Sequence, residues 1–265
     1  MKNYRLWGKP PNKVVVVHGG PGAPGSMAPV ARELSKDFGV MELLETASTV
    51  QGQIEELANV LNTQGELPVI IVGWSWGAAL SYMTTAKHPE LVKKLVLIGT
   101  SPVLARKGPR PDPLPIYLER FTEVEKAEFF RLVSNLRDEK TKDKNAEFGK
   151  LCRVIGNAEI FEPIPAKDDV IEYQFDINQA IGQELNKLIL GRTLIEAGKK
   201  IECPVVAIQG DFDSNIAEEL RDALSSVIKN FKFILLNKCG HSPWVEKYAR
   251  DEFFKAMREE IILWL

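Results

Sequence analysis

The sequence predicts an α/β protein with a mostly parallel, doubly wound sheet and an inserted helical segment. Short runs of β-branched residues alternate along the chain with segments of helical spacing, which is the pattern of a parallel sheet whose strands are joined by helices. Over roughly residues 103–200 the strand runs stop and amphipathic helical patterns take their place. A serine between two glycines also stands where one of the strand runs passes directly into a helix.

The bulk properties restrict the possible partners. A chain of 265 residues is long enough for one large domain carrying an insertion. Its 45% hydrophobic and 26% charged residues are ordinary for a soluble globular protein. The formal net charge of −2 provides no basic surplus, which argues against a nucleic-acid or anionic-membrane partner. The chain has no signal-peptide-like start and no apolar run that could span a bilayer.

The cysteines indicate the compartment. Cys152, Cys203 and Cys239 are odd in number and lack the spacing of metal ligands, so we interpret them as free thiols in a reducing environment. We therefore expect a cytoplasmic protein that uses neither a metal nor a cofactor.

The first part of the chain alternates strand and helix patterns. Apolar, β-branched runs predict buried strands at residues 13–17, 40–44 and 69–72, and helical spacing predicts helices at residues 26–37 and 49–62. The first strand ends in the glycine-rich turn HGGPG, residues 18–22. Glycines at this point allow a turn whose backbone N–H groups face the space above the sheet edge, where an anion could bind.

The third strand passes into the segment around which the chain is organised. Gly73 and Gly77 flank Ser75 at a strand-to-helix turn, which is the pattern of a nucleophile elbow. Small residues on both sides let the backbone fold back sharply, so that the serine hydroxyl is exposed in a strained conformation. The helix that starts beside Ser75 presents free N–H groups to developing negative charge.

The middle of the chain leaves the sheet. A strand is expected at residues 94–98. The stretch that follows is rich in proline and therefore cannot be a helix interior or a central strand. Its prolines are Pro102, Pro109, Pro111, Pro113 and Pro115. Thr122 and Glu125 form a capping box that opens a helix, and residues 147–155 and 177–190 have further amphipathic patterns. We interpret residues 103–200 as a helical cap over a core formed by residues 1–102 and 201–265.

The last part of the chain returns to the sheet. Strands are expected at residues 203–208 and 232–236, with a helix at residues 217–228 between them and a long closing helix from about residue 243 to 264. The first of these strands ends in a turn that holds Asp211 and Asp213, and the second ends in a turn that holds His241.

A serine hydroxyl is a weak nucleophile at neutral pH and needs a neighbouring base that is oriented by a third group. The sequence has three histidines. His18 lies within the glycine-rich turn, where we expect its ring to brace the loop, and His88 follows a helix away from the strand ends. His241 follows the final strand at the edge where Ser75 emerges, so we predict that it is the base.

The orienting carboxylate should follow a strand that lies between Ser75 and His241 in the sequence, giving the order Ser, Asp, His. The turn after residue 98 has no acid, whereas the turn after residue 208 offers both Asp211 and Asp213. The position of the turn alone does not separate the two.

At this point the chain resembles the α/β-hydrolase superfamily. The resemblance covers nearly the whole chain and rests on HGGPG, GWSWG, HPELVKKLVL, GDFD and GHSP. It implies an α/β-hydrolase fold, and its G-x-x-D spacing selects Asp213. The motifs HGGPG and SWG look most like the proline iminopeptidase branch, and by position they imply that the backbone N–H groups of Gly20 and Trp76 form the oxyanion hole.

Two features depart from that branch. Its usual acid-Gln-Arg-Gly loop is replaced by residues 45–49, Glu-Thr-Ala-Ser-Thr. The N-terminal region is short, so the first two strands of the usual sheet should be reduced or absent.

These observations predict a serine hydrolase that cleaves a small ester, an amide or a short peptide through Ser75, His241 and Asp213. An aminopeptidase would need cap carboxylates to hold a free α-amine, and candidates by region are Glu159, Glu162, Asp168, Asp169 and Glu172. Alternatives are a non-catalytic ligand-binding member of the fold and non-hydrolytic chemistry such as perhydrolysis or C–C bond cleavage. Serine as nucleophile argues against haloalkane dehalogenase and epoxide hydrolase activities.

Overall fold

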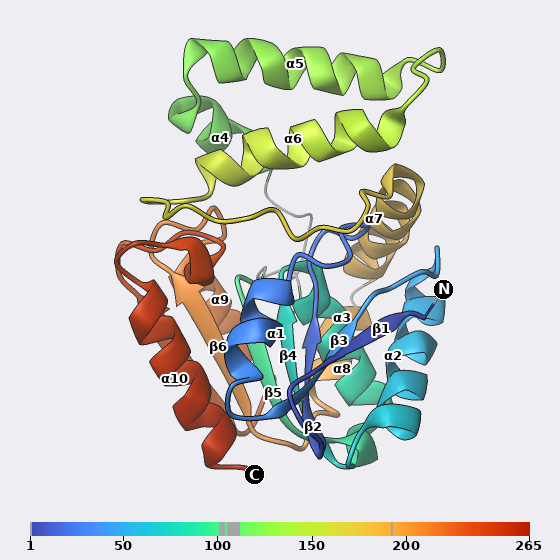
Figure 1. Cartoon of the computed structure of the whole chain (residues 1–265), viewed down its shortest axis with the longest axis vertical. Coiled ribbons are helices and arrows are strands. Elements are labelled where there is room, and N and C mark those ends of the chain that lie inside the picture. Colours follow the sequence, from blue (N-terminus) through green and yellow to red (C-terminus); the bar gives the residue numbers. More distant parts are fainter. Residues whose placement is uncertain (1, 101–103, 105–111, 192) are drawn as a thin grey trace.

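The computed structural model describes residues 2–100, 104, 112–191 and 193–265. In this part of the chain seven strands form one sheet in the order β1-β3-β2-β4-β5-β6-β7 (Figure 1). The strands are β1 (Tyr4–Trp7), β2 (Asn12–Val17), β3 (Gly39–Leu43), β4 (Val69–Trp74), β5 (Val92–Ile98), β6 (Val205–Gly210) and β7 (Phe231–Leu236). Only β1 is antiparallel to its neighbour. The predicted fold class, an α/β protein with a mostly parallel sheet, is confirmed.

The shortened N-terminal region still contributes an edge strand. β1 pairs with β3, and the side chains of Arg5 and Trp7 on this strand both donate hydrogen bonds to Glu42, which is fully buried. Because a buried carboxylate is stable only when it is paired, these contacts attach β1 to the sheet.

Helices cover both faces of the sheet. Alternate residues of β2 belong to different cores, with Val14 and Val16 on one face and Val15 and Val17 on the other, all fully buried. One face packs against α1 (Ala28–Leu34) and α10 (Arg250–Ile262), and the other against α2 (Val50–Gln64), α3 (Trp76–Lys87), α8 (Thr193–Gly198) and α9 (Ala217–Ser225). Burial on both faces explains why the strands are continuous apolar runs.

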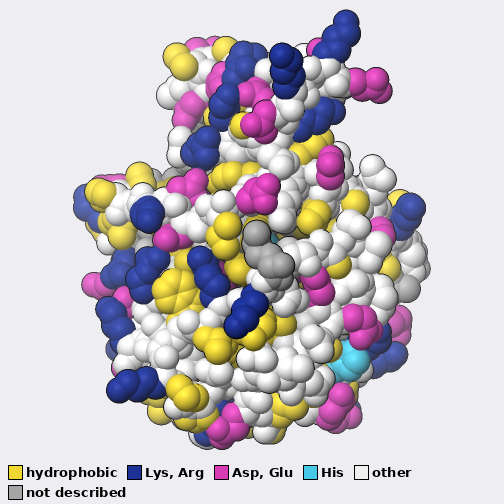
Figure 2. Space-filling view, turned by 45° about the vertical axis from the view of Figure 1, so that its right-hand side comes forward, with side chains coloured by type: hydrophobic (Ala, Val, Ile, Leu, Met, Phe, Trp, Pro, Cys, Tyr) yellow, Lys and Arg dark blue, Asp and Glu magenta, His cyan; other side chains and the backbone are white. Residues whose placement is uncertain are grey.

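Helices of the region predicted to be a cap stand over the carboxyl ends of the strands, and we keep the word cap for this region (Figure 1). Its upper lobe consists of α4 (Leu114–Arg120), α5 (Glu123–Arg137) and α6 (Lys144–Ala158), which share a small aromatic core around Tyr117, Phe121 and Phe129. The predicted capping box between Thr122 and Glu125 is confirmed. Charged side chains of both signs cover this lobe in Figure 2, and hydrophobic ones gather where it meets the core.

The remaining cap helix, α7 (Phe175–Leu190), lies beside the lobe and also packs against the core. Its Ile181 and Ile189 are buried in the same apolar cluster as α2 and α3. The division into a core and a cap of residues 103–200 stays a prediction.

Of two expectations about helices, the one about the prolines agrees with the described residues and the one about the closing helix needs correction. Pro115 lies in the first turn of α4, where a proline is tolerated because that N–H has no helical partner; Pro102, Pro109 and Pro111 lie outside the described residues. The closing helix begins only at Arg250, after a short 3-10 turn η3 (Pro243–Val245). Between the two, Glu246 has an extended backbone and forms an isolated β-bridge with Pro163, so the helix cannot continue through it. Its buried carboxylate accepts the backbone N–H groups of Gly240 and Phe161.

Within the described ranges, none of the helices combines the length and the apolar character that crossing a bilayer requires.

Candidate active site

Ser75 occupies a strained turn between β4 and α3. Its φ of 54° and ψ of −116° lie outside the regions that L-residues prefer, and its N–H donates to the carbonyl oxygen of Ile98, 2.9 Å away. A Cβ on Gly77 would meet the carbonyl oxygens of Val17 and His18, and one on Gly73 would lie 2.6 Å from Ser81 Oγ. The flanking glycines are therefore required by close packing, as the elbow pattern predicts.

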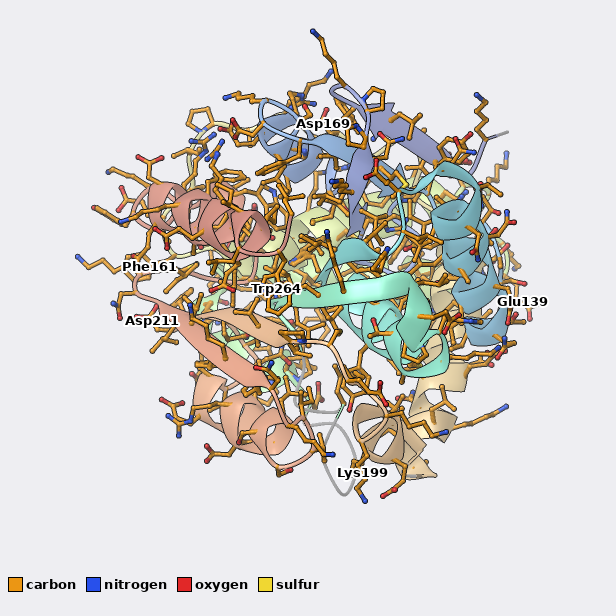
Figure 3. All side chains as sticks on the ribbon, turned by 90° about the horizontal axis from the view of Figure 1, so that it is seen from below. Glu139, Phe161, Asp169, Lys199, Asp211 and Trp264 are labelled. Carbon is orange, nitrogen blue, oxygen red and sulfur yellow. The ribbon has the colours of Figure 1, made fainter. Side chains whose placement is uncertain are left out.

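His241 and Asp213 meet behind the serine. His241 Nδ1 lies 2.8 Å from Asp213 Oδ2, and both side chains are largely buried. The second carboxylate oxygen of Asp213 accepts hydrogen bonds from the backbone and side-chain amides of Asn215, at 2.9 and 3.1 Å. Asp211 is instead exposed at the rim of the molecule, where it accepts the backbone N–H of Cys239 at 3.1 Å (Figure 3).

The catalytic candidates share a cavity of about 330 Å³ between the core and the cap. Ser75 and His241 line it together with Gly20 and Trp76, the two residues that the resemblance assigns to the oxyanion hole. Gly20 has a φ of 123°, which favours glycine, and Trp76 is the first residue of α3, so its N–H has no partner within the helix. Asp213 lies behind His241, outside this lining.

Aromatic and backbone contacts hold the histidine loop in place. The Trp74 indole N–H donates to the carbonyl oxygen of His241 at 2.8 Å, and the two rings lie 5.4 Å apart. The backbone N–H of His241 donates to the carbonyl oxygen of Glu159, also at 2.8 Å. His241 is therefore held in place both by Trp74 at the end of β4 and by Glu159 just after α6.

Glu159 is the one of the five acidic cap candidates that lines this cavity. Its Oε1 accepts hydrogen bonds from the hydroxyls of Tyr117, at 2.5 Å, and Ser214, at 3.2 Å. Of the other four, Glu162 pairs with a lysine, Asp168 and Asp169 pair with arginines, and Glu172 is exposed. The sequence contains no spacing that would have singled out Glu159 or linked it to Tyr117.

His18 is fully buried beneath the glycine-rich turn. Its Nδ1 lies 2.7 Å from the carbonyl oxygen of Gly19, and its Nε2 pairs with Glu45, which is also buried. Burial alone would lower the pKa of His18, but the charge and hydrogen bond of Glu45 outweigh it and raise the pKa above the ordinary value. Burial raises the pKa of Glu45, against the opposing effect of His18. His88 lies after α3, 3.7 Å from Glu90, and away from this cavity.

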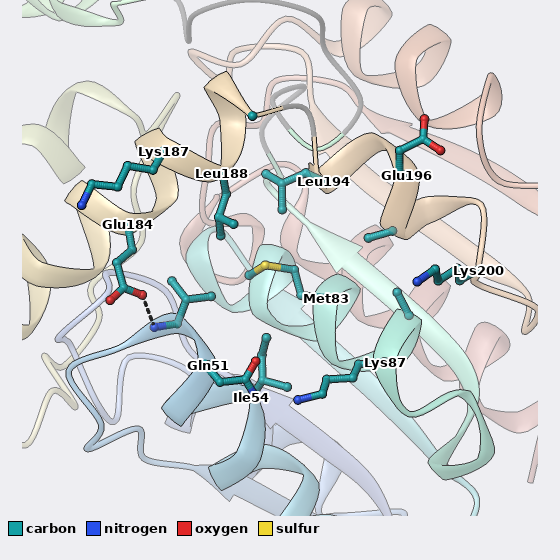
Figure 4. A pocket seen from close by; sticks show the side chains of 14 residues that line it. Gln51, Ile54, Met83, Lys87, Glu184, Lys187, Leu188, Leu194, Glu196 and Lys200 are labelled. Carbon is teal, nitrogen blue, oxygen red and sulfur yellow. Dashed lines mark hydrogen bonds between the residues drawn. The ribbon is translucent and has the colours of Figure 1, made fainter.

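A larger hollow, of about 730 Å³, lies between α2, α3, α7 and α8 (Figure 4). Its lining combines apolar residues such as Ile54, Met83 and Leu194 with lysine and glutamate side chains at the rim. Neither Ser75 nor His241 reaches it, so we assign the chemistry to the smaller cavity.

Comparisons with known proteins agree with this fold. A family model described as the alpha/beta hydrolase fold matches residues 49–248. The chain is 25% identical over 213 residues to a pimeloyl-[acyl-carrier protein] methyl ester esterase of Shewanella woodyi, covering 79% of this chain and 77% of that protein. It is 21% identical over 243 residues to an (R)-3-hydroxydecanoyl-ACP:CoA transacylase of Pseudomonas putida, covering 87% and 76%.

A solved structure shows the same fold over nearly the whole length. The enol-lactonase of Burkholderia xenovorans superimposes with a TM-score of 0.62 at 18% identity, covering 98% of this chain and 95% of that one. None of these three relatives is an iminopeptidase, so the resemblance to that branch remains a prediction. Because the family model spans about three quarters of the sequence, the chain belongs to the alpha/beta hydrolase fold family.

Proposed function

We propose that the protein is a serine hydrolase that cleaves small esters through Ser75, His241 and Asp213. The observation that carries this proposal is the shared cavity, in which a strained serine, a histidine backed by a carboxylate at 2.8 Å and two candidate oxyanion donors come together. The esterases among its relatives support the same reaction class.

The mechanism follows from the roles of these groups. His241 Nδ1–H donates a hydrogen bond to Asp213, which leaves Nε2 free to take the proton of the Ser75 hydroxyl as its oxygen attacks the ester carbonyl carbon. The negative charge that develops on the carbonyl oxygen is stabilised by the N–H groups of Gly20 and Trp76. The imidazolium then protonates the departing alcohol, and water hydrolyses the acyl-enzyme by the same steps.

The test is hydrolysis of p-nitrophenyl acyl esters by the wild type and by Ser75→Ala. The substitution removes a small side chain, so the fold should persist while kcat falls by about 10³-fold or more. Ser225→Ala, an exposed serine on α9, is the matched control and should retain full activity. A serine-reactive phosphonate should label Ser75 alone; labelling elsewhere, or undiminished turnover by Ser75→Ala, would refute the proposal.

One observation favours aminopeptidase activity as a second candidate. Glu159 places a carboxylate in the catalytic cavity, where it could pair with the ammonium group of a peptide N-terminus, since an unpaired charge there would be costly. Short acyl esters require less, namely an apolar cavity and the same oxyanion donors, so we rank esterase activity first. Efficient cleavage of proline-p-nitroanilide with much slower ester hydrolysis would reverse that order, and Glu159→Gln should then raise KM for the anilide.

Binding without catalysis is the third function to consider. It would be favoured by the loss of a triad residue, whereas Ser75, His241 and Asp213 are all present. Perhydrolysis and C–C bond cleavage would use the same three residues, and a cytoplasmic location stays a prediction.

A further inference from the structure

A second hollow in the cap, of about 500 Å³, lies between α5, α6 and α7. We call it the outer groove. The residues of its lining that matter here are Leu136 and Arg137 from α5, Phe148 and Leu151 from α6, and Asn178 and Gln183 from α7.

One face of α6 joins the outer groove to the catalytic cavity. Phe148, Leu151, Ile155 and Glu159 are spaced by three, four and four residues, so their side chains lie on one face along α6 and just past its end. The first two line the outer groove and the last two line the catalytic cavity. The two hollows are therefore successive along the same helix face.

Helix α7 provides a second connection between the outer groove and the catalytic cavity. Asn178 lines the outer groove, and its side-chain amide donates to the carbonyl oxygen of Pro21 at 3.0 Å. Pro21 belongs to the glycine-rich turn and lines the catalytic cavity. The outer groove therefore adjoins the glycine-rich turn at the contact between Asn178 and Pro21.

The chemistry of the outer groove changes along its length. Its inner part is apolar, with Leu136, Phe148 and Leu151. Its polar lining consists of amide side chains and of Arg137, and no carboxylate lines the groove. The Arg137 side chain is exposed and forms no salt bridge with any residue that the structure describes. An apolar chain with an anion at its far end would match both parts.

We propose that the acyl chain of the ester substrate extends from Ser75 along α6 into the outer groove and ends in an anionic group near Arg137. This inference rests on the proposed esterase function and specifies its substrate class as esters of medium-chain acids with a terminal carboxylate or similar anion. From Ile155 to Phe148 the helix rises about 10 Å, which corresponds to about eight carbon–carbon bonds of an extended chain.

The first test compares p-nitrophenyl acetate with p-nitrophenyl decanoate. Each methylene group that moves from water to an apolar surface increases the binding constant about fourfold. Burial of several methylene groups of the decanoyl chain should therefore make kcat/KM for decanoate at least about tenfold higher than for acetate. Gln183→Trp fills the groove from an exposed position on α7 and should abolish this preference while hydrolysis of acetate is unchanged. Asn186→Trp, exposed on the same helix and outside both linings, is the matched control and should retain it.

The second test addresses the anionic end. The p-nitrophenyl monoester of decanedioic acid has a carboxylate in place of the terminal methyl group of the decanoyl chain. With this substrate Arg137→Gln should lower kcat/KM by about threefold to fivefold, the upper part of the range expected for an exposed ion pair. The same substitution should not change hydrolysis of unsubstituted decanoate.

The outcomes separate this inference from the proposed function. A wild type that hydrolyses no acyl ester contradicts the proposed function itself. Two results would refute only the assignment of the acyl chain to the outer groove: a wild type that hydrolyses acetate and decanoate equally well, or a Gln183→Trp variant with the wild-type chain-length profile. An equal effect of Arg137→Gln on the decanoate ester and on the monoester of decanedioic acid would refute the proposal that the substrate ends in an anionic group near Arg137.

Discussion

The sharpest prediction concerns the two aspartates that stand two residues apart after β6. In the structure Asp213 Oδ2 lies 2.8 Å from His241 Nδ1, and Oδ1 accepts hydrogen bonds from two donors of Asn215. Asp213→Asn leaves a single side-chain oxygen for these three donors. If that oxygen stays with Asn215, the new amide NH₂ faces His241 Nδ1, and the ring must move its proton to Nε2, where it can no longer accept the serine proton.

The expected loss is large for one aspartate and small for the other. Asp213→Asn should lower kcat by about 10³- to 10⁴-fold, which corresponds to about 4–5.5 kcal/mol of transition-state stabilisation. Asp211→Asn keeps an oxygen that can accept the backbone N–H of Cys239 at the exposed rim, so its effect should stay below about threefold.

The assay is steady-state hydrolysis of p-nitrophenyl acetate at pH 8, with the melting temperature of each variant measured by circular dichroism. An intact melting temperature separates the loss of the base from the loss of the fold. The reasoning fails if Asp211→Asn is the more damaging change, or if a folded Asp213→Asn enzyme retains more than a tenth of the wild-type kcat.

Three further predictions follow from other parts of the structure. Gly77→Ala places a Cβ against the carbonyl oxygens of Val17 and His18 and should lower Tm by about 5 °C or more; an unchanged Tm would contradict the close packing of the elbow. The pKa of His18 is raised from 6.5, so its stabilising contribution is complete below pH 6.5 and is lost as the pH rises. The raised pKa of Glu45 acts in the same direction, starting from its ordinary value of 4.5; Tm should therefore fall on the alkaline side, and Glu45→Gln should flatten that fall rather than leave it unchanged. Burial raises the pKa of the Cys152 thiol to about 12, so iodoacetamide at pH 7.5 should leave esterase activity intact, and rapid inactivation with modification of Cys152 would show that the thiol is accessible.

Local patterns in the sequence were sufficient for the fold class and for the residue types of the site. Buried parallel strands must be apolar on both faces, so β2, β4, β5 and β6 are visible as short β-branched runs. A strained turn around Ser75 requires small neighbours, so the two glycines mark it. The carboxyl ends of parallel strands share one edge of the sheet, which is why Ser75, His241 and the turn that holds Asp211 and Asp213 could be grouped before any contact was known; the family resemblance then selected Asp213.

Helix ends were predicted less well, because their determinants lie far along the chain. The closing helix starts only at Arg250 because Glu246 is extended and forms an isolated β-bridge with Pro163, far away in the sequence. Pro115 is compatible with α4 only because it falls in the first turn. Neither condition is contained in local periodicity.

The tertiary structure shows how residues that the position in a turn or a region leaves equivalent differ in their contacts. Asp211 and Asp213 occupy the same turn, and the direction of each side chain relative to His241 separates them. Glu159 is one of five cap acids, and it reaches the catalytic cavity because the end of α6 packs on the loop that carries His241. Periodicity specifies which face of a helix is apolar, whereas the partner of that face depends on contacts between segments distant in sequence, and those contacts form only when the whole chain has folded.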